Sequence, residues 1–373
     1  MKVPRAVLLL VPLPHRLSVA STRPTGNMLT DALGIGGRYY RMASSAQRLA
    51  WIDSTKGVAI VLVVFGHAWR GCHDAGLFAG MPPGFFEAVD TRIYAFHMPL
   101  FFLISGLFLL PSLAHRGPAT FLKDRLARLF YPMLLWTYVF AGSKLLAGQF
   151  ANHPLALSDF PLLPIPGQWQ YWFLWALLLM HVGVLLLRPI LLSERFGRAA
   201  LWGLLAASLA LQAAPLPPSL IFWTSNAPAF LPYLVMGMLL GEHGGLRKAG
   251  PAAGMAATGI FVLVLAFMPA LNAVGLPRVV TAALLCLAML GSVSWLSGRF
   301  SALGAGLAAL GAASMIIFLS HTLFSASLRI GLLAAGIGDL VLHLVAGSLV
   351  GLLLPLLLKR AAERTGRSAL IGV

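Results

Sequence analysis

Long apolar runs alternate with short polar or Gly/Pro-rich breaks along most of this 373-residue chain. The runs are about 15–22 residues long, close to the roughly 20 helical residues that cross a hydrocarbon core of about 30 Å. Backbone groups in lipid must pair with one another, and a helix pairs them within one segment. The pattern therefore predicts an all-α, polytopic membrane helix bundle of about ten transmembrane helices. We expect spans near residues 54–71, 93–111, 129–147, 171–192, 199–213, 228–241, 252–271, 278–296, 305–326 and 336–358.

Charged residues make up only 10% of the chain, against about 25% in soluble domains. The net charge of +16 comes from basic residues that gather in alternate loops, as in the cytoplasmic loops of membrane proteins. It therefore does not indicate a nucleic-acid partner. With the N-terminus inside, the outer side receives only Arg70, Arg92, Arg278 and Arg329, and Lys144 lies within a span. This asymmetry predicts that both termini are cytoplasmic.

The two ends of the chain differ from the apolar body. Residues 1–47 are basic and Gly/Pro-rich, and we interpret them as a disordered extension or as an over-called start, with initiation near Met28 or Met42. Residues 48–360 form the expected transmembrane domain, and residues 361–373 a short basic cytoplasmic tail. Cys72 and Cys286 are too few and too far apart for a disulfide framework or a metal site, so no metal is expected.

The first span carries two polar residues with a meaningful spacing. Lys56 precedes His67 by eleven residues, which places them about 16 Å apart, three turns along one helix face. A histidine within the membrane is costly and is expected to face the bundle interior or a cavity. The alternative interpretation is a snorkelling lysine and a structural histidine.

Other polar residues allow functional and structural interpretations. His97 opens the second span, where it is either functional or interfacial, and the pair Ser105-Gly106 is typical of close helix packing. Arg125 and Arg128 share a helix face; they either clamp a phosphate or are ordinary loop residues. His321 is a second imidazole in an apolar helix, with the same need for a polar partner. His181 and His343 are interpreted as structural.

Five motifs follow one another along the chain: Lys56 to His67, Phe102 to Gly106 (Phe-x-x-Ser-Gly), Arg125 to Arg128, Trp172 to Leu174, and Ser314 to His321. In this order they resemble the acyltransferase 3 family of membrane-bound O-acyltransferases that modify bacterial cell-surface carbohydrates, and within it the fucose 4-O-acetylase-related branch. The resemblance covers about residues 48–360. It departs where the late motif has Ile317 and Phe318 in place of the usual tyrosines, which leaves the hydrogen bonding of His321 open.

The resemblance implies an enzyme that moves an acetyl or other small acyl group from cytoplasmic acetyl-CoA to a hydroxyl of a cell-surface or lipid-linked carbohydrate. Acetyl-CoA is then a co-substrate rather than a permanently bound cofactor, and the protein is a multi-pass protein of the plasma (inner) membrane, in contact with lipid. Phe102, Ser105, Gly106 and Trp172 are carried over as motif or packing residues. The acceptor and the oligomeric state are not readable from the sequence.

The resemblance also assigns roles to polar residues. Lys56, Arg125 and Arg128 suit the phosphates of CoA, with Asp53 supporting Lys56 from three residues away. His67 acts as general base on the acceptor hydroxyl or accepts the acyl group itself. His321 or His97 orients the acceptor or stabilises the oxyanion.

Two other functions are alternatives to acyl transfer. A transporter or exporter of a lipid-linked sugar would use the intramembrane histidines as proton-relay groups. A structural membrane scaffold would not need polar residues aligned with the enzyme motifs. The sequence favours the acyltransferase.

Overall fold

The computed structural model describes residues 50–372 except 215, 243–247 and 269–274. The predicted extension at residues 1–47 lies outside the described residues. Within them the chain is helical and no strand occurs. The helices are α3 (Ala50–Asp74), α4 (Phe85–Tyr94), α5 (His97–Leu107), α6 (Leu109–His115), α7 (Pro118–Arg125), η1 (Leu126–Phe130), α8 (Tyr131–Ala147), η2 (Gly148–Phe150), η3 (Leu157–Asp159), η4 (Trp169–Tyr171), α9 (Trp172–Leu186), α10 (Arg188–Leu191), α11 (Gly197–Ala210), α12 (Pro218–Trp223), α13 (Ala227–Glu242), α14 (Pro251–Phe267), α15 (Leu276–Arg299), α16 (Ser301–Ala312), α17 (Ser314–Ala334), α18 (Leu340–Arg364) and η6 (Ser368–Ile371).

Helix length and apolarity confirm a multi-pass membrane protein. Seven helical runs in the described part of the chain are long and apolar enough to cross a bilayer, and two of them, Phe85–His115 and Pro118–Phe150, join several consecutive helices. Four shorter apolar helices, α11, α13, α14 and α16, have 10–17 residues. Every predicted span falls on at least one helix, while the count of ten and the orientation of the termini stay predictions.

The predicted ninth span, 305–326, is not one helix. The structure ends α16 at Ala312 and begins α17 at Ser314. Helix α16 packs closely against α3: a Cβ atom on Gly311 would overlap the backbone of Asp53, and one on Gly57 would overlap the carbonyl group of Leu307. Small residues thus bring α16 and α3 into backbone contact, the usual means of helix association in lipid.

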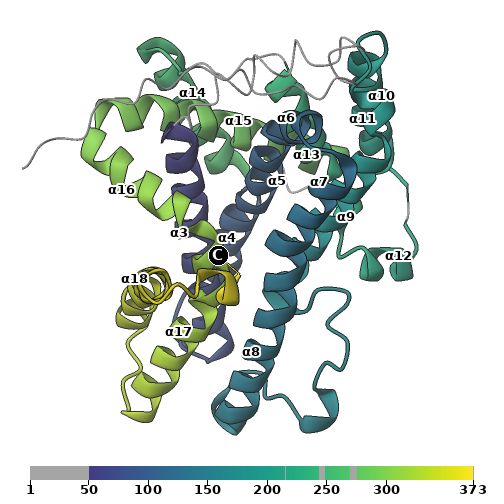
Figure 1. Cartoon of the computed structure of the whole chain (residues 1–373). Helices are drawn as coiled ribbons and strands as arrows, with labels where there is room; N and C mark the ends of the chain where they lie inside the picture. Colours follow the sequence, from purple (N-terminus) through teal and green to yellow (C-terminus); the bar gives the residue numbers. More distant parts are fainter. Residues whose placement is uncertain (1–49, 215, 243–247, 269–274, 373) are drawn as a thin grey trace, which may run out of the picture.

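Helix α3 lies at the centre of the bundle and packs against α5, α15, α16, α17 and α18 (Figure 1). Helix α5 packs in turn against α13 through Gly106 and Gly237, each of which leaves no room for a Cβ atom beside the other helix. Helix α8 runs beside α17 in Figure 1 and contacts it. The polar residues of interest come from α3, α5 and α17 and from the segment that comprises α7, η1, α8 and α9.

Candidate active site

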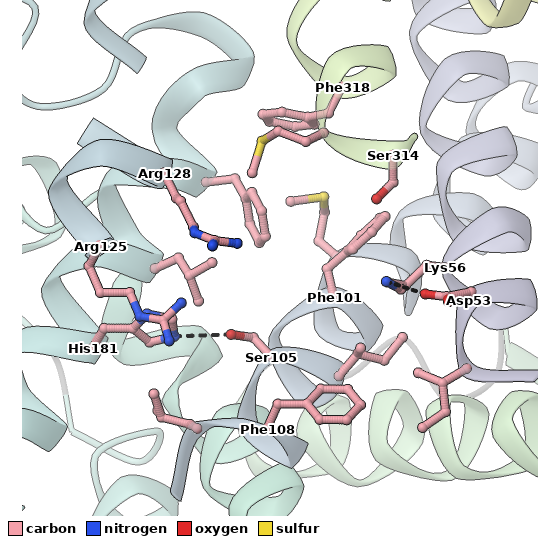
Figure 2. A pocket seen from close by; sticks show the side chains of 17 residues that line it. Asp53, Lys56, Phe101, Ser105, Phe108, Arg125, Arg128, His181, Ser314 and Phe318 are labelled. Carbon is pink, nitrogen blue, oxygen red and sulfur yellow. Dashed lines mark hydrogen bonds and ion pairs between the residues drawn. The ribbon is translucent and has the colours of Figure 1, made fainter. Parts of the chain in front are cut away.

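One cavity of about 510 Å³ lies between α3, α5, α9, α17 and the α7–η1 turn; we call it the lysine cavity. Lys56, Arg125 and Arg128 line it, so the three cations singled out in the sequence meet in one space. Figure 2 shows the two arginines on one wall and Lys56 on the opposite wall. The cations therefore surround the cavity instead of forming one cluster.

Asp124 organises the arginine wall. Its Oδ1 accepts a hydrogen bond from Arg128 Nε at 2.8 Å, and its Oδ2 accepts one from Arg116 Nη1 at 2.6 Å. Arg125 lies 3.8 Å from the same carboxylate and donates from Nη2 to Ser112 Oγ at 2.8 Å. Sequence reasoning missed Asp124, although its four-residue spacing from Arg128 was a readable signal.

The opposite wall carries the pair anticipated from the sequence. The ammonium group of Lys56 lies 2.5 Å from a carboxylate oxygen of Asp53, three residues earlier on α3. Both residues line the lysine cavity. Because the ammonium group has three donors and no acceptor, this ion pair leaves Lys56 able to bind a further anion.

A serine and a histidine make a hydrogen bond inside the lysine cavity. Ser105 Oγ lies 3.0 Å from His181 Nε2, as the dashed line in Figure 2 shows. The neighbouring Gly106 makes the helix contact, while Ser105 faces the cavity. The sequence interpretation treated His181 as structural. The cost of an imidazole in an apolar helix, which was used for His67, applied to His181 as well.

A second cavity of about 610 Å³, the histidine cavity, contains His67, His97 and Trp172 in its lining. It continues from the lysine cavity along the same helices: residues 52–56 of α3 line the first, and residues 63–74 of α3 line the second. The two cavities share Met98 and Phe318. They are therefore neighbouring chambers that meet at these two side chains.

His67 and His321 lie together at this junction. Their ring centroids are 5.0 Å apart with the rings edge to face. His321 is fully buried, and its Nδ1 lies 2.8 Å and 2.9 Å from the carbonyl oxygens of Ile317 and Phe318. Carbonyl oxygens only accept, so Nδ1 of His321 carries the proton and Nε2 of the neutral ring keeps a lone pair. Backbone carbonyl groups thus accept the hydrogen bond of His321, a contact that the absence of the family's tyrosines had left undetermined.

His97 is held in the same way, with Nδ1 donating to the carbonyl oxygen of Ile93 at 2.6 Å. The ring of Tyr94 lies between, 4.6 Å from the ring of His97 and 6.5 Å from that of His67. The guanidinium of Arg70 covers the Tyr94 ring at 3.3 Å. Tyr94 was not singled out by sequence reasoning, because a tyrosine at a membrane interface is an ordinary feature.

The turn before α9 supports the part of α17 that carries His321. Tyr171 donates its hydroxyl to the carbonyl oxygen of Leu319 at 2.8 Å, and Gln170 donates to Thr322 Oγ1 at 2.8 Å. Leu319 lies two residues before His321, and Thr322 directly follows it. The two bonds therefore hold the segment of α17 that contains His321 against the turn before α9.

The aromatic motif residues occupy different surroundings. Phe102 is fully buried, with its ring centroid 4.9 Å from that of Phe173 and 4.8 Å from that of Phe230. Trp172 lines the histidine cavity. Phe102 therefore packs the wall, and Trp172 presents a ring to whatever enters the chamber.

An all-helical multi-pass protein with two neighbouring chambers, both lined partly by charged and polar side chains, belongs to the membrane enzymes or transporters. The family comparison decides between these classes: the chain belongs to the acyltransferase 3 family, whose profile, described as "Acyltransferase domain", matches residues 49–360. This match confirms the resemblance seen in the motifs.

Two curated relatives carry the name Nodulation protein NolL. The one from Sinorhizobium fredii (strain NBRC 101917 / NGR234) is 29% identical over 180 residues, which cover 48% of this chain and 46% of the relative. The one from Mesorhizobium japonicum (strain LMG 29417 / CECT 9101 / MAFF 303099) is 26% identical over 211 residues, 56% of this chain and 52% of the relative. The matches thus span about half the length of each relative. No solved structure matches the chain significantly.

Proposed function

We propose that this protein transfers an acetyl group from acetyl-CoA, which enters the lysine cavity, to a hydroxyl of a carbohydrate in the histidine cavity. The observation that carries the proposal is the meeting of the two cavities at Met98 and Phe318, beside His67 and His321. A donor and an acceptor that arrive from different sides of a membrane need such a junction. Membership of an acyltransferase family supports the reaction class.

The lysine cavity suits the donor. Guanidinium groups match phosphate oxygens in a fork geometry, and Arg125 and Arg128 stand on one wall with Lys56 on the other. The phosphates of CoA would lie between them, and the pantetheine arm would extend toward Met98. From Lys56 to His67 the rise along α3 is about 16 Å, a distance suited to an extended arm.

The reaction needs two proton transfers, one from the acceptor hydroxyl to His67 and one from His67 to the CoA thiolate. His67 takes the proton of the acceptor hydroxyl while its oxygen attacks the thioester carbonyl carbon. The bond from carbon to sulfur breaks, the acetyl ester forms, and the CoA thiolate receives the proton from His67. We favour this role over a transient acyl-histidine, because His67 borders the acceptor cavity and a direct attack needs only this one base.

The tautomer of His321 excludes one of its two expected roles, the stabilisation of an oxyanion. A neutral ring whose Nδ1–H is committed to backbone carbonyls has no donor left for an oxyanion. Its Nε2 lone pair can instead accept a hydrogen bond from the ring of His67 and steady the positive charge that forms there. We therefore assign His321 to positioning His67. His97, held by Ile93 in the same way, is assigned to orienting the acceptor.

The location of each step follows from the charge asymmetry of the sequence. We propose that the lysine cavity opens to the cytoplasm, where acetyl-CoA is made, and that both termini lie there, as basic loops indicate. The histidine cavity then faces the exterior of the plasma membrane, where a cell-surface or lipid-linked carbohydrate is available. The names of the relatives support a role outside general metabolism but specify no acceptor.

The test is the His67→Ala variant. Purified wild-type protein should transfer radiolabelled acetyl groups from acetyl-CoA to surface glycans isolated from cells that lack the protein, and His67→Ala should lose the activity by at least about a hundredfold. Membrane insertion and size-exclusion profile should stay as in the wild type. Near-wild-type transfer by the variant would refute the assignment. Wild-type protein that moves no acetyl group would favour the exporter alternative.

A further inference from the structure

The histidine cavity is lined by four cationic side chains, those of Arg70, Lys144, Arg278 and Arg329, and by a single carboxylate, that of Asp74. Arg70 is already neutralised by Asp90, which accepts two hydrogen bonds from it at 2.7 Å. The other three cations make no ion pair within 4 Å to any residue that the structure describes. A neutral carbohydrate would not need them.

Arg329 is the most informative of the three. Its Nε is buried without a hydrogen-bond partner among the described residues. Its guanidinium reaches over Gly71 so closely that a Cβ atom there would overlap Nη1. Asp74, the carboxylate of this cavity, lies within 3.3 Å of His153 and does not pair with Arg329. Arg329 as a whole is half-buried, but a buried donor such as its Nε is costly to leave unpaired unless an anion is present to accept from the guanidinium.

The distribution of charge along the chain strengthens this point. With the N-terminus inside, the sequence places only four arginines on the outer side, and three of them, Arg70, Arg278 and Arg329, line this one cavity. Lys144, the lysine inside a predicted span, lines it too. Charged residues at membrane depth mark substrate pathways. Basic residues are thus sparse on this side except where the acceptor would bind.

We propose that the acceptor carbohydrate carries an oxyanion, a phosphate or a carboxylate, that Arg329 binds together with Arg278 and Lys144. This inference rests on the proposed function and adds the chemical class of its acceptor. The guanidinium of Arg329 donates two hydrogen bonds to the anion. The bound anion then holds the sugar so that one of its hydroxyl groups reaches His67, which lines the same cavity. The ring of Trp169, with the ammonium of Lys144 at 5.4 Å from its centroid, lies in the same wall.

The experiment measures binding separately from catalysis. Trp169 and Trp172 both line the cavity, so their fluorescence reports occupancy in the purified full-length protein. Inorganic pyrophosphate represents a diphosphate-linked acceptor, glucuronate represents a uronic acid, and glucose is the neutral control. We expect one of the two anions to bind at least about tenfold more tightly than glucose, as hydrogen bonds to charged groups do. The anion that binds identifies the source of the oxyanion.

Variants locate the site. Arg329→Gln should abolish the preference for the anion, and Arg278→Gln, at an exposed position, should reduce it even if the first variant folds poorly. Arg92→Gln, on the same side but outside the cavity, should retain it. Arg125→Ala should also retain it, which separates this site from the lysine cavity. Equal binding of glucose and both anions, or a preference unchanged in Arg329→Gln and Arg278→Gln, would overturn the inference.

The same samples separate this inference from the proposed function. His67→Ala should bind the anion as the wild type does while transferring no acetyl group. Anion binding that depends on Arg329 in a wild-type protein without transferase activity would refute the enzymatic proposal alone. Acetyl transfer without such binding would refute the anionic acceptor alone.

Discussion

Replacing His321 with phenylalanine tests the positioning role assigned to the buried histidine. Phenylalanine keeps a ring of similar size in a fully buried position but removes the Nε2 lone pair that faces no other partner in the described structure. We expect His321→Phe to lower kcat and to leave the KM for acetyl-CoA within about twofold of the wild type. The reason is that His321 is not in the lining of the cavity that holds Lys56, Arg125 and Arg128.

The size of the effect follows from the charge that His67 acquires. As general base it becomes an imidazolium in the transition state, so its hydrogen bond to His321 is charge-assisted. Such bonds contribute about 1.5–3 kcal/mol, which corresponds to a ten- to hundredfold loss of kcat, roughly. His321→Gln, whose amide oxygen also accepts a hydrogen bond, should recover part of the loss.

His343 provides a matched control for this experiment. It is also buried in a long apolar helix, and its Nε2 donates to the carbonyl oxygen of Ile337 at 2.8 Å. Unlike His321, it is not among the rings that contact His67 in the described structure. The assay compares acetyl transfer from radiolabelled acetyl-CoA for His321→Phe and His343→Phe at equal amounts of folded protein. Equal losses of kcat in the two variants would show that burial alone explains the effect and would refute the positioning role.

Two further predictions concern the donor wall and the packing of the bundle. Arg125→Ala should raise the KM for acetyl-CoA by about tenfold or more without changing that for the acceptor, whereas Lys123→Ala, at an exposed position that does not line the cavity, should change neither in steady-state kinetics. Gly57→Ala should force α3 away from the carbonyl group of Leu307 and destabilise the protein by about 1–3 kcal/mol, seen as a lower Tm in detergent. Gly142→Ala, with open space beside it, should leave the Tm unchanged.

The sequence predicted the fold class well because lipid imposes a simple rule. Each span needs a long apolar stretch, and such stretches are visible without any knowledge of packing. The break at Ala313 was invisible for the same reason, since both α16 and α17 are apolar. The close packing of α16 on α3 through Gly311 and Gly57 was invisible too, because it depends on how helices far apart in sequence approach.

Sequence reasoning found the site residues whose polarity contrasts with an apolar helix, such as His67 and His321. It missed residues whose importance depends on the residues they contact in the folded protein. Asp124 joins the arginine wall, and His181 meets Ser105 from a helix 76 positions away along the chain. Periodicity describes one helix at a time, so it could not show that the cations of the two cavities belong to separate chambers.

The meeting of the two cavities at Met98 and Phe318 has an electrical consequence. Where water-filled chambers approach from both sides of a membrane, the transmembrane voltage falls mainly across the short segment between them. A full elementary charge that crosses 100 mV gains or loses about 2.3 kcal/mol, whereas a neutral group crosses without electrical work. An uncharged acetyl group would therefore pass this junction at any membrane potential. A charged acyl group such as succinyl would make the rate of transfer depend on voltage.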